Sequence, residues 1–209
     1  PANKWCSSNP VSTWRGITID NAKHITGIDR CEQNLKGTIP DLSGLPELQS
    51  LSLCENQLNG EIPDMSDLTK LQTLDLSDNQ LSGSIPDSAQ LPSSLQNLEL
   101  NQNELTGEIP DLSQTNLQRL SLYSNRLSGP IPDLTQLPPN LQYFSVQNNQ
   151  LAGEIPASLQ DSGLSGLTLG YNKLSASDSG LRFFLELKDP EWESTQTVAP
   201  SNLATDTPT

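Results

Sequence analysis

The chain has 209 residues, of which 33% are hydrophobic and 4% aromatic, and its formal net charge is −14. Such an acidic surface repels the phosphates of nucleic acids and anionic membranes, so neither is an expected partner, whereas a neutral or basic protein is favoured. No apolar run approaches the roughly 20 residues that a membrane-spanning helix needs, so membrane insertion is not expected. Few aromatic residues suffice for a coil in which each repeat packs on the next.

A motif of the form L-x-x-L-x-L-x-x-N-x-L-x-G-x-I-P recurs between residues 25 and 174. One complete copy contains Leu48, Leu51, Leu53, Asn56, Leu58, Gly60, Ile62 and Pro63. The copies begin 22 to 24 residues apart, a period and a consensus that identify leucine-rich repeats. The predicted fold is an α/β repeat solenoid, a horseshoe of seven repeats with a concave parallel β-sheet and mostly 3₁₀ turns on the convex side.

Within one repeat, each letter of the motif has a structural role. Leu51-Ser52-Leu53 alternates inward and outward and predicts a short strand. Asn56 is expected to point inward where the strand ends and to bond backbone groups that the bend leaves unpaired. Gly60 allows the return bend, and Pro63 ends the extended segment. The asparagines of this ladder are Asn56, Asn79, Asn103, Asn125, Asn149 and Asn172, with Gln33 in the first repeat.

The L-x-G-x-I-P element resembles the plant-specific class of leucine-rich repeats, found in receptor-kinase ectodomains, polygalacturonase-inhibiting proteins and microbial secreted proteins. The resemblance implies a twisted solenoid whose L-x-G-x-I segments add a second short strand. Residues 1–24 resemble the N-terminal cap of this class, with the W-x-G-I-T signature beginning at Trp14. Residues 175–200, with apolar positions at helical spacing, resemble a C-terminal cap with a short helix, and residues 201–209 are expected to be a tail.

The three cysteines allow more than one pairing. Cys31 and Cys54 hold the same position in adjacent repeats, and neighbouring strands lie ~4.8 Å apart, within reach of a disulfide. In the cap that this segment resembles, cysteines occur as a pair, but Ile19 stands where the second is usual. A Cys31–Cys54 bridge, a bridge to Cys6 and free thiols therefore remain alternatives.

The residues offer little for catalysis. His24 is the one histidine, and no Ser or Cys nucleophile or metal-ligand cluster accompanies it at a recognisable spacing. We therefore expect no catalytic residues, no cofactor and no enzyme activity.

The outward positions of the predicted strands fall into two zones. The N-terminal zone is acidic and contains Asp29, Glu32, Glu55, Asp75, Asp78 and Glu99. The C-terminal zone contains Arg119, Tyr123, Tyr143 and Tyr171, with Arg126 and Lys173 nearby. Tyr and Arg often dominate interface energies, so the predicted partner site is Arg119, Tyr123, Tyr143 and Tyr171 together with Asp75, Asp78 and Glu99. The alternative is an ordinary solvated sheet face with chance clustering.

A second array of aspartates follows each I-P pair. Its members are Asp41, Asp64, Asp87, Asp111 and Asp133, and Ala157 takes the place in the next repeat. The simpler interpretation is that each aspartate caps the turn behind its proline. The alternative is a stripe that binds divalent cations, because hard cations prefer carboxylate oxygens.

These features predict a non-enzymatic recognition module that binds a protein or peptide, or a glycan, through its concave face. One alternative is a structural or surface protein whose Asp array binds cations, mineral or ice, and another is an inhibitor of a secreted hydrolase. The resemblance implies an extracellular or cell-surface location. We expect a monomer or a part of a larger assembly.

Overall fold

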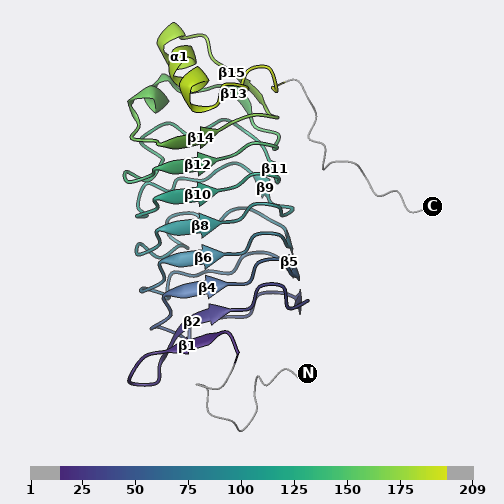
Figure 1. Cartoon of the computed structure of the whole chain (residues 1–209), viewed down its shortest axis with the longest axis vertical. Coiled ribbons are helices and arrows are strands. Elements are labelled where there is room, and N and C mark those ends of the chain that lie inside the picture. Colours follow the sequence, from purple (N-terminus) through teal and green to yellow (C-terminus); the bar gives the residue numbers. More distant parts are fainter. Residues whose placement is uncertain (1–14, 197–209) are drawn as a thin grey trace, which may run out of the picture.

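The computed structural model describes residues 15–196, which wind into a coil of stacked repeats with one main sheet along its length (Figure 1). In this part of the chain, eight strands form the main sheet: β1 (Ile17–Ile19), β2 (Ile25–Asp29), β4 (Ser50–Ser52), β6 (Thr73–Asp75), β8 (Asn97–Glu99), β10 (Arg119–Ser121), β12 (Tyr143–Ser145) and β14 (Gly166–Thr168). The predicted leucine-rich-repeat solenoid with a parallel sheet is confirmed. The solvent-facing surface of this sheet is called the concave face below.

The strands of the main sheet are aligned residue for residue. From β2 to β14 each strand pairs in parallel with that of the next repeat, and Leu51 lies beside Leu74, which lies beside Leu98. Only β1 runs antiparallel, against β2, among the strands described. Because the register is constant, equivalent residues of successive repeats form continuous rows along the coil.

A second set of short strands follows the bend, as the resemblance implied. They are β3 (Lys36–Gly37), β5 (Gln57–Gly60), β7 (Gln80–Leu81), β9 (Thr106–Gly107), β11 (Arg126–Leu127), β13 (Ala152–Glu154) and β15 (Lys173–Ser175). Across residues 15–196 they pair as three separate small sheets. Several of these strands end at the motif glycine, and the positive φ of 79° at Gly60 shows why a residue without a Cβ stands there.

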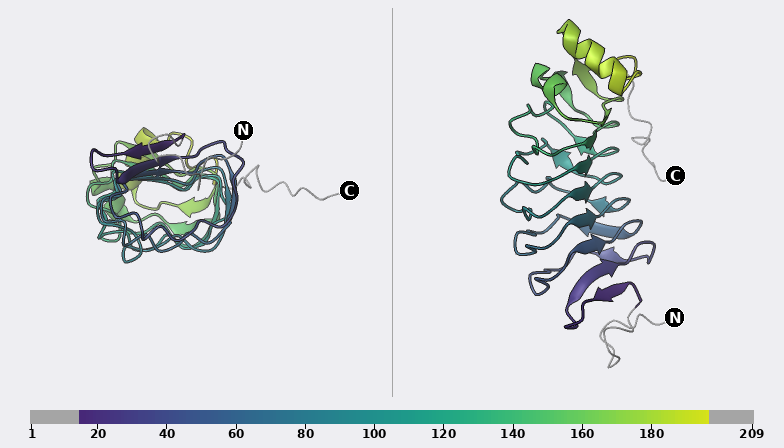
Figure 2. Two further views of the ribbon diagram at one scale, coloured as in Figure 1. Left: turned by 90° about the horizontal axis from the view of Figure 1, so that it is seen from below. Right: turned by 60° about the vertical axis from the view of Figure 1, so that its left-hand side comes forward.

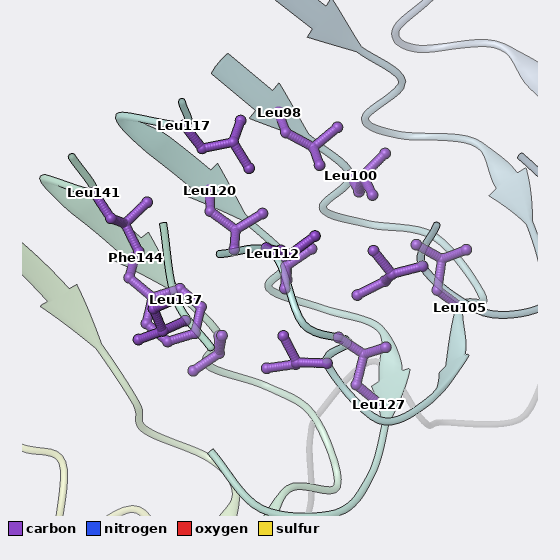
Figure 3. Packing of buried hydrophobic residues seen from close by; sticks show 14 of the residues in the cluster. Leu98, Leu100, Leu105, Leu112, Leu117, Leu120, Leu127, Leu137, Leu141 and Phe144 are labelled. Atoms are coloured by element: carbon purple, nitrogen blue, oxygen red, sulfur yellow. The ribbon is translucent and has the colours of Figure 1, made fainter. Parts of the chain in front are cut away.

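The interior of the coil is filled by the motif leucines and isoleucines. Figure 3 shows Leu98, Leu120 and Phe144 of three successive strands pointing into the same space as the leucines of the opposite wall. All three are fully buried. Seen along its axis, the coil encloses this core on all sides (Figure 2). Each repeat thus buries its apolar side chains largely against the next.

The asparagine ladder lies inside the bend. Asn103 donates its amide to the carbonyls of Leu76, Leu100 and Asn101 at 3.0 to 3.3 Å, and its oxygen accepts the N–H of Leu81 at 3.0 Å. The same pattern recurs at Asn56, Asn79, Asn125, Asn149 and Asn172. One side chain therefore satisfies four backbone groups in two adjacent repeats, which joins consecutive repeats through polar contacts inside the coil.

The convex side has short turns closed by hydrogen bonds from residue i+3 to residue i, which is the 3₁₀ pattern that was predicted. Among the described residues, a 3₁₀ helix occurs in one repeat only, at η2 (Ala157–Asp161). The other repeats have isolated hydrogen-bonded turns, such as the bonds from Leu68 N–H to the Met65 carbonyl and from Leu71 N–H to the Leu68 carbonyl. η2 begins at the position where Ala157 replaces the aspartate that follows I-P in the earlier repeats. Ala157 has no carboxylate to accept the N–H two positions later, and η2 has no side-chain cap.

The C-terminal end of the coil is closed by α1 (Ser179–Lys188) and the loop after it. Leu181, Leu185 and Trp192 are buried against the last repeat. Gln196 accepts the N–H of Leu174 at 2.9 Å and donates to the carbonyl of Leu169. It therefore occupies the place that an asparagine holds in each repeat before it.

At the other end, a disulfide joins the first two repeats. The sulfurs of Cys31 and Cys54 are 2.04 Å apart, and their Cα atoms are 4.5 Å apart. This settles the pairing of these two cysteines, whereas Cys6 and the predicted N-terminal cap before residue 15 lie outside the described residues. Within residues 15–196 no helix is long and apolar enough to cross a bilayer.

Candidate functional site

The concave face presents four rows of outward-facing residues. The first row is Gly27, Ser50, Thr73, Asn97, Arg119, Tyr143 and Gly166. The second is Asp29, Ser52, Asp75, Glu99, Ser121, Ser145 and Thr168. The third is Cys31, Cys54, Ser77, Asn101, Tyr123, Gln147 and Gly170, and the fourth is Glu32, Glu55, Asp78, Gln102, Ser124, Asn148 and Tyr171. All the predicted partner-site residues belong to these rows.

Arg119 is held by its neighbours on either side. Its guanidinium carbon lies 4.4 Å from the centroid of the Tyr143 ring, and its Nε lies 3.8 Å from Oε1 of Glu99. The Tyr143 ring in turn leans over Gly166, where a Cβ would come within 2.7 Å of the ring. Arg119 and Tyr143 remain half exposed, so the stack presents a preformed flat surface to solvent.

Tyr123 stands in the third row of the same repeat as Arg119, two residues after Ser121, which is the register neighbour of Glu99. Burial raises the pKa of the Tyr123 hydroxyl, and the negative charges of Asp78, Glu99 and Asp75 raise it further. These three acids belong to the two preceding repeats, so the nearby charge on the N-terminal side of Tyr123 is negative. The two predicted zones meet at Tyr123, which carries an uncharged hydroxyl among acids at neutral pH.

The same carboxylates influence one another. Burial raises the pKa of Glu99, a hydrogen bond from Ser121 and the charge of Arg119 lower it, and the charge of Asp75 raises it. Burial and then Asp75 raise the pKa of Asp78. For both groups the raising causes prevail, so negative charge is crowded at this point of the face.

Hydrogen bonds fix the orientation of these acids. Asp75 accepts the hydroxyl and the N–H of Ser77 at 2.6 and 3.1 Å, and Gln102 donates its amide to Asp78. These donors are neutral, so they orient the carboxylates without neutralising their charge.

The fourth row has a backbone conformation that the sequence analysis missed. Its residues have positive φ values between 52° and 63°: Glu32, Glu55, Asp78, Gln102, Ser124, Asn148 and Tyr171. Non-glycine residues rarely adopt this conformation. It is maintained by bonds to the next repeat, including that from the Asp78 N–H to the Asn101 carbonyl at 3.0 Å. No motif letter marks this position, and only Asp78 and Asn148 are of the residue types that favour the left-handed conformation.

Three residues of the predicted Tyr/Arg zone, Tyr171, Arg126 and Lys173, lie apart from the Arg119–Tyr143 pair. Tyr171 is 41% exposed and stands in the fourth row of the last repeat, whereas Tyr143 stands in the first row of the repeat before it. Arg126 and Lys173 belong to β11 and β15, beyond the bend, and Arg126 pairs there with Glu104 at 3.2 Å. The geometry thus unites Arg119 with Tyr143 and Glu99.

The aspartates that follow I-P each cap a turn. Their carboxylates accept the N–H of the residue two positions later at 2.7 to 2.8 Å; the pairs are Asp41–Ser43, Asp64–Ser66, Asp87–Ala89, Asp111–Ser113 and Asp133–Thr135. These hydrogen bonds lower the pKa of Asp41, Asp64, Asp111 and Asp133. The capping interpretation therefore accounts for this array without a cation.

The other potentially reactive side chains are engaged in an ion pair or a disulfide. His24 is exposed, with its Nδ1 3.0 Å from Oδ2 of Asp20. Within the described residues, a group of three potential metal ligands consists of Cys31, Cys54 and Asp75, whose ligand atoms lie within 4.8 Å of one another. Both sulfurs are bound in the disulfide, and metals take the thiolate form of cysteine.

Comparison with known proteins agrees with this architecture. The family model described as Leucine Rich repeats (2 copies) matches residues 46–92, and that described as Leucine Rich Repeat matches residues 94–115, 116–137 and 140–162. The crystal structure of Pollen Receptor Kinase 3 is 31% identical, with a TM-score of 0.67, and the match covers 83% of each chain. This chain belongs to the leucine-rich-repeat family.

Other leucine-rich-repeat proteins are similar over most of the chain. The BIR3–SERK2 complex from Arabidopsis thaliana contains a chain that is 31% identical, with a TM-score of 0.54, and the match covers 80% of this chain and 83% of that one. The plant peptide hormone receptor RGFR1, solved in complex with RGF2, is 36% identical with a TM-score of 0.59, over 66% of this chain and 23% of the receptor. Leucine-rich-repeat domains of this type are typically non-catalytic binding modules.

A probable leucine-rich repeat receptor-like protein kinase of Arabidopsis thaliana is 43% identical over 54 residues. That match covers 25% of this leucine-rich-repeat chain and 6% of the kinase. The chain thus spans a small part of that relative.

Proposed function

We propose that this leucine-rich-repeat chain is a non-enzymatic recognition module that binds a protein or peptide partner through its concave face. The observation that carries the proposal is the preformed stack of Arg119 on Tyr143, which is half exposed and continuous with Tyr123 and the acidic residues. Ordered aromatic and arginine side chains bind with little loss of conformational entropy. The motif residues inside the coil are committed to packing, so the outward rows are free to vary with the partner.

The comparisons support a partner of this class. RGFR1 is a peptide hormone receptor whose structure was solved with RGF2, and BIR3 was solved with SERK2. These proteins share the solenoid of this chain, and we extend to it the use of that solenoid for binding a peptide or a protein. An extracellular or cell-surface location accompanies the proposal, because the Cys31–Cys54 disulfide suits an oxidising compartment.

The experiment compares three forms of the immobilised protein as baits for extracellular protein fractions. They are the wild type, the Tyr123→Ala/Tyr143→Ala variant and the Phe183→Ala/Leu187→Ala variant, which removes exposed apolar side chains from α1 instead. Proteins that the wild type and the α1 variant retain but the tyrosine variant loses are then purified and titrated against all three forms. A directly binding partner that the tyrosine variant binds as tightly as the wild type does would contradict the proposal.

A further inference from the structure

The outward rows of the concave face contain more acidic than basic residues. In the four outward rows of the described repeats, six residues are acidic: Asp29, Glu32, Glu55, Asp75, Asp78 and Glu99. Arg119 is the one basic residue in these rows, and it already contacts Glu99 and Tyr143. The face therefore offers uncompensated negative charge beside an aromatic surface.

The imbalance is greatest where Tyr123 meets the acids. Asp75 and Glu99 are paired neighbours in the register of β6 and β8, so their side chains stand side by side. Asp78 lies close enough for the charge of Asp75 to raise its pKa. Tyr123 follows two residues after Ser121, the register neighbour of Glu99, on the same face of the sheet, and it is only partly buried. Like charges held together in this way are relieved when a cation approaches them.

Aromatic and acidic groups together suit one kind of side chain. A guanidinium or an ammonium ion binds carboxylates and also the face of an aromatic ring. A phosphate or a carboxylate would be repelled by the same acids, and an apolar side chain would leave their charge unrelieved. Charge complementarity therefore favours a basic segment over the other occupants that a sheet face can accept.

We propose that the concave face from β6 to β12 docks a basic segment of a protein or peptide partner, with a Lys or Arg side chain lying against Tyr123 beside Asp78 and Glu99. The Arg119–Tyr143 stack forms the next part of the same surface and contacts the uncharged part of the segment. This inference rests on the proposed function and adds the chemistry of the partner and the position of its cation.

The probe is an acetylated and amidated octapeptide of four Arg-Gly units, with a citrulline-Gly octapeptide as its neutral counterpart. Backbone amide shifts of the labelled protein are followed during titration at low salt. We expect saturable shifts that centre on β6, β8 and β10, a much weaker response to the citrulline peptide, and loss of binding as salt is raised.

Two variants with equal change of net charge separate a local site from general attraction to an acidic protein. Asp78→Asn/Glu99→Gln neutralises two acids of the proposed surface. Glu61→Gln/Glu108→Gln neutralises two exposed acids beyond the bend. We expect about tenfold weaker binding of the arginine peptide to the first variant, and binding to the second that stays close to wild type. Equal weakening in both, or shifts spread over the whole coil, would overturn the inference.

In a second experiment, the affinity of a natural partner identified with the immobilised protein is measured for the same variants. If its affinity depends on Tyr123 and Tyr143 but not on Asp78 and Glu99, the proposed function stands and the basic-segment inference fails. If its affinity depends on neither pair, the proposed function fails as well. Thermal unfolding of each variant shows whether the fold is intact, and we expect neither charge variant to lose the cooperative transition.

Discussion

The guanidinium carbon of Arg119 lies 4.4 Å from the centroid of the Tyr143 ring. The two residues belong to the same row, and Arg119 stands one repeat before Tyr143. The pair is set by the register of β10 and β12, which places these two residues directly beside each other. The ring has room to lean toward β14 because Gly166, the next residue in the row, has no side chain. A glycine two repeats away thus controls the position of the arginine.

Gly166→Ala tests this control. Its added Cβ would lie 2.7 Å from Cδ1 of Tyr143, so the ring must rotate away, and the Arg119 contact loosens. We expect the Nε–Hε resonance of Arg119 to lose its ring-current shift, while the melting temperature changes little because the glycine lacks a positive φ. Gly163→Ala, where a Cβ meets open space, is the control. An unchanged Arg119 resonance in the Gly166 variant would refute the coupling.

Asn103→Leu should destabilise the coil by about 1–3 kcal/mol, because it leaves buried carbonyls and an N–H group without partners. Urea unfolding at neutral pH measures the change in the free energy of unfolding. Asn59→Leu is the matched control, since Asn59 is exposed on β5. If both substitutions have the same small effect, the ladder contributes less to stability than the bond pattern indicates.

Leu120→Ala should cost about 2–5 kcal/mol, since it opens a cavity between repeats on both sides. Leu187→Ala removes a leucine that is 67% exposed on α1 and should stay within about 0.5 kcal/mol of wild type. Denaturant unfolding followed by circular dichroism measures both values. A mild effect at Leu120 would show that neighbouring repeats can close the gap.

Asp64→Ala should lower the melting temperature at neutral pH, with a difference that shrinks under acid. Hydrogen bonds from Ser66 lower the pKa of Asp64 below its usual 3.8. A carboxylate with a lowered folded-state pKa stabilises the fold above its unfolded pKa and loses this contribution as the pH falls through the folded value. Melting curves from pH 7 to pH 2 test the trend against Asp67→Ala, an exposed aspartate of the same turn. A difference that is independent of pH would exclude a charge-dependent cap.

Removal of the Cys31–Cys54 bridge by Cys31→Ser/Cys54→Ser should cost about 3 kcal/mol in the chain-entropy description, given the 23-residue separation. Dithiothreitol should destabilise the wild type by a similar amount and leave the variant unchanged. Chemical unfolding with and without the reductant gives the four values. A variant that dithiothreitol still destabilises would point to another reducible bond.

The repeat motif was enough to predict the solenoid because each of its letters has a structural role that recurs. The sequence also places Gln196 24 residues after Asn172, one period further along the ladder. Glutamine supplies the same amide as asparagine, and its longer side chain reaches the backbone of the last repeat from the cap. The repeat motif ends at Leu174, although the hydrogen-bonding requirement of the last repeat continues beyond it.

The candidate site was less accessible to sequence reasoning. The rows followed from strand alternation, but the contacts that a long side chain makes within them did not, such as the stacking of Arg119 on Tyr143. The pairing of Cys31 with Cys54 also stayed open, since repeat position alone does not decide whether adjacent thiols are oxidised. Both depend on contacts between repeats, which a motif describes only on average.

The constant register of the main sheet also fixes the spacing that a ligand must match. Strands lie ~4.8 Å apart, whereas an extended chain advances ~3.4 Å per residue, so three repeats span nearly the same ~14 Å as four ligand residues. From Asp75 on β6 to Ser145 on β12, which stands in the same row, is three repeats. An extended ligand that crosses the strands can therefore contact these two positions with residues i and i+4. Side chains alternate along an extended chain, so both of these residues point toward the sheet. The strand spacing of the solenoid and the residue spacing of an extended peptide therefore match only at every third repeat and every fourth peptide residue.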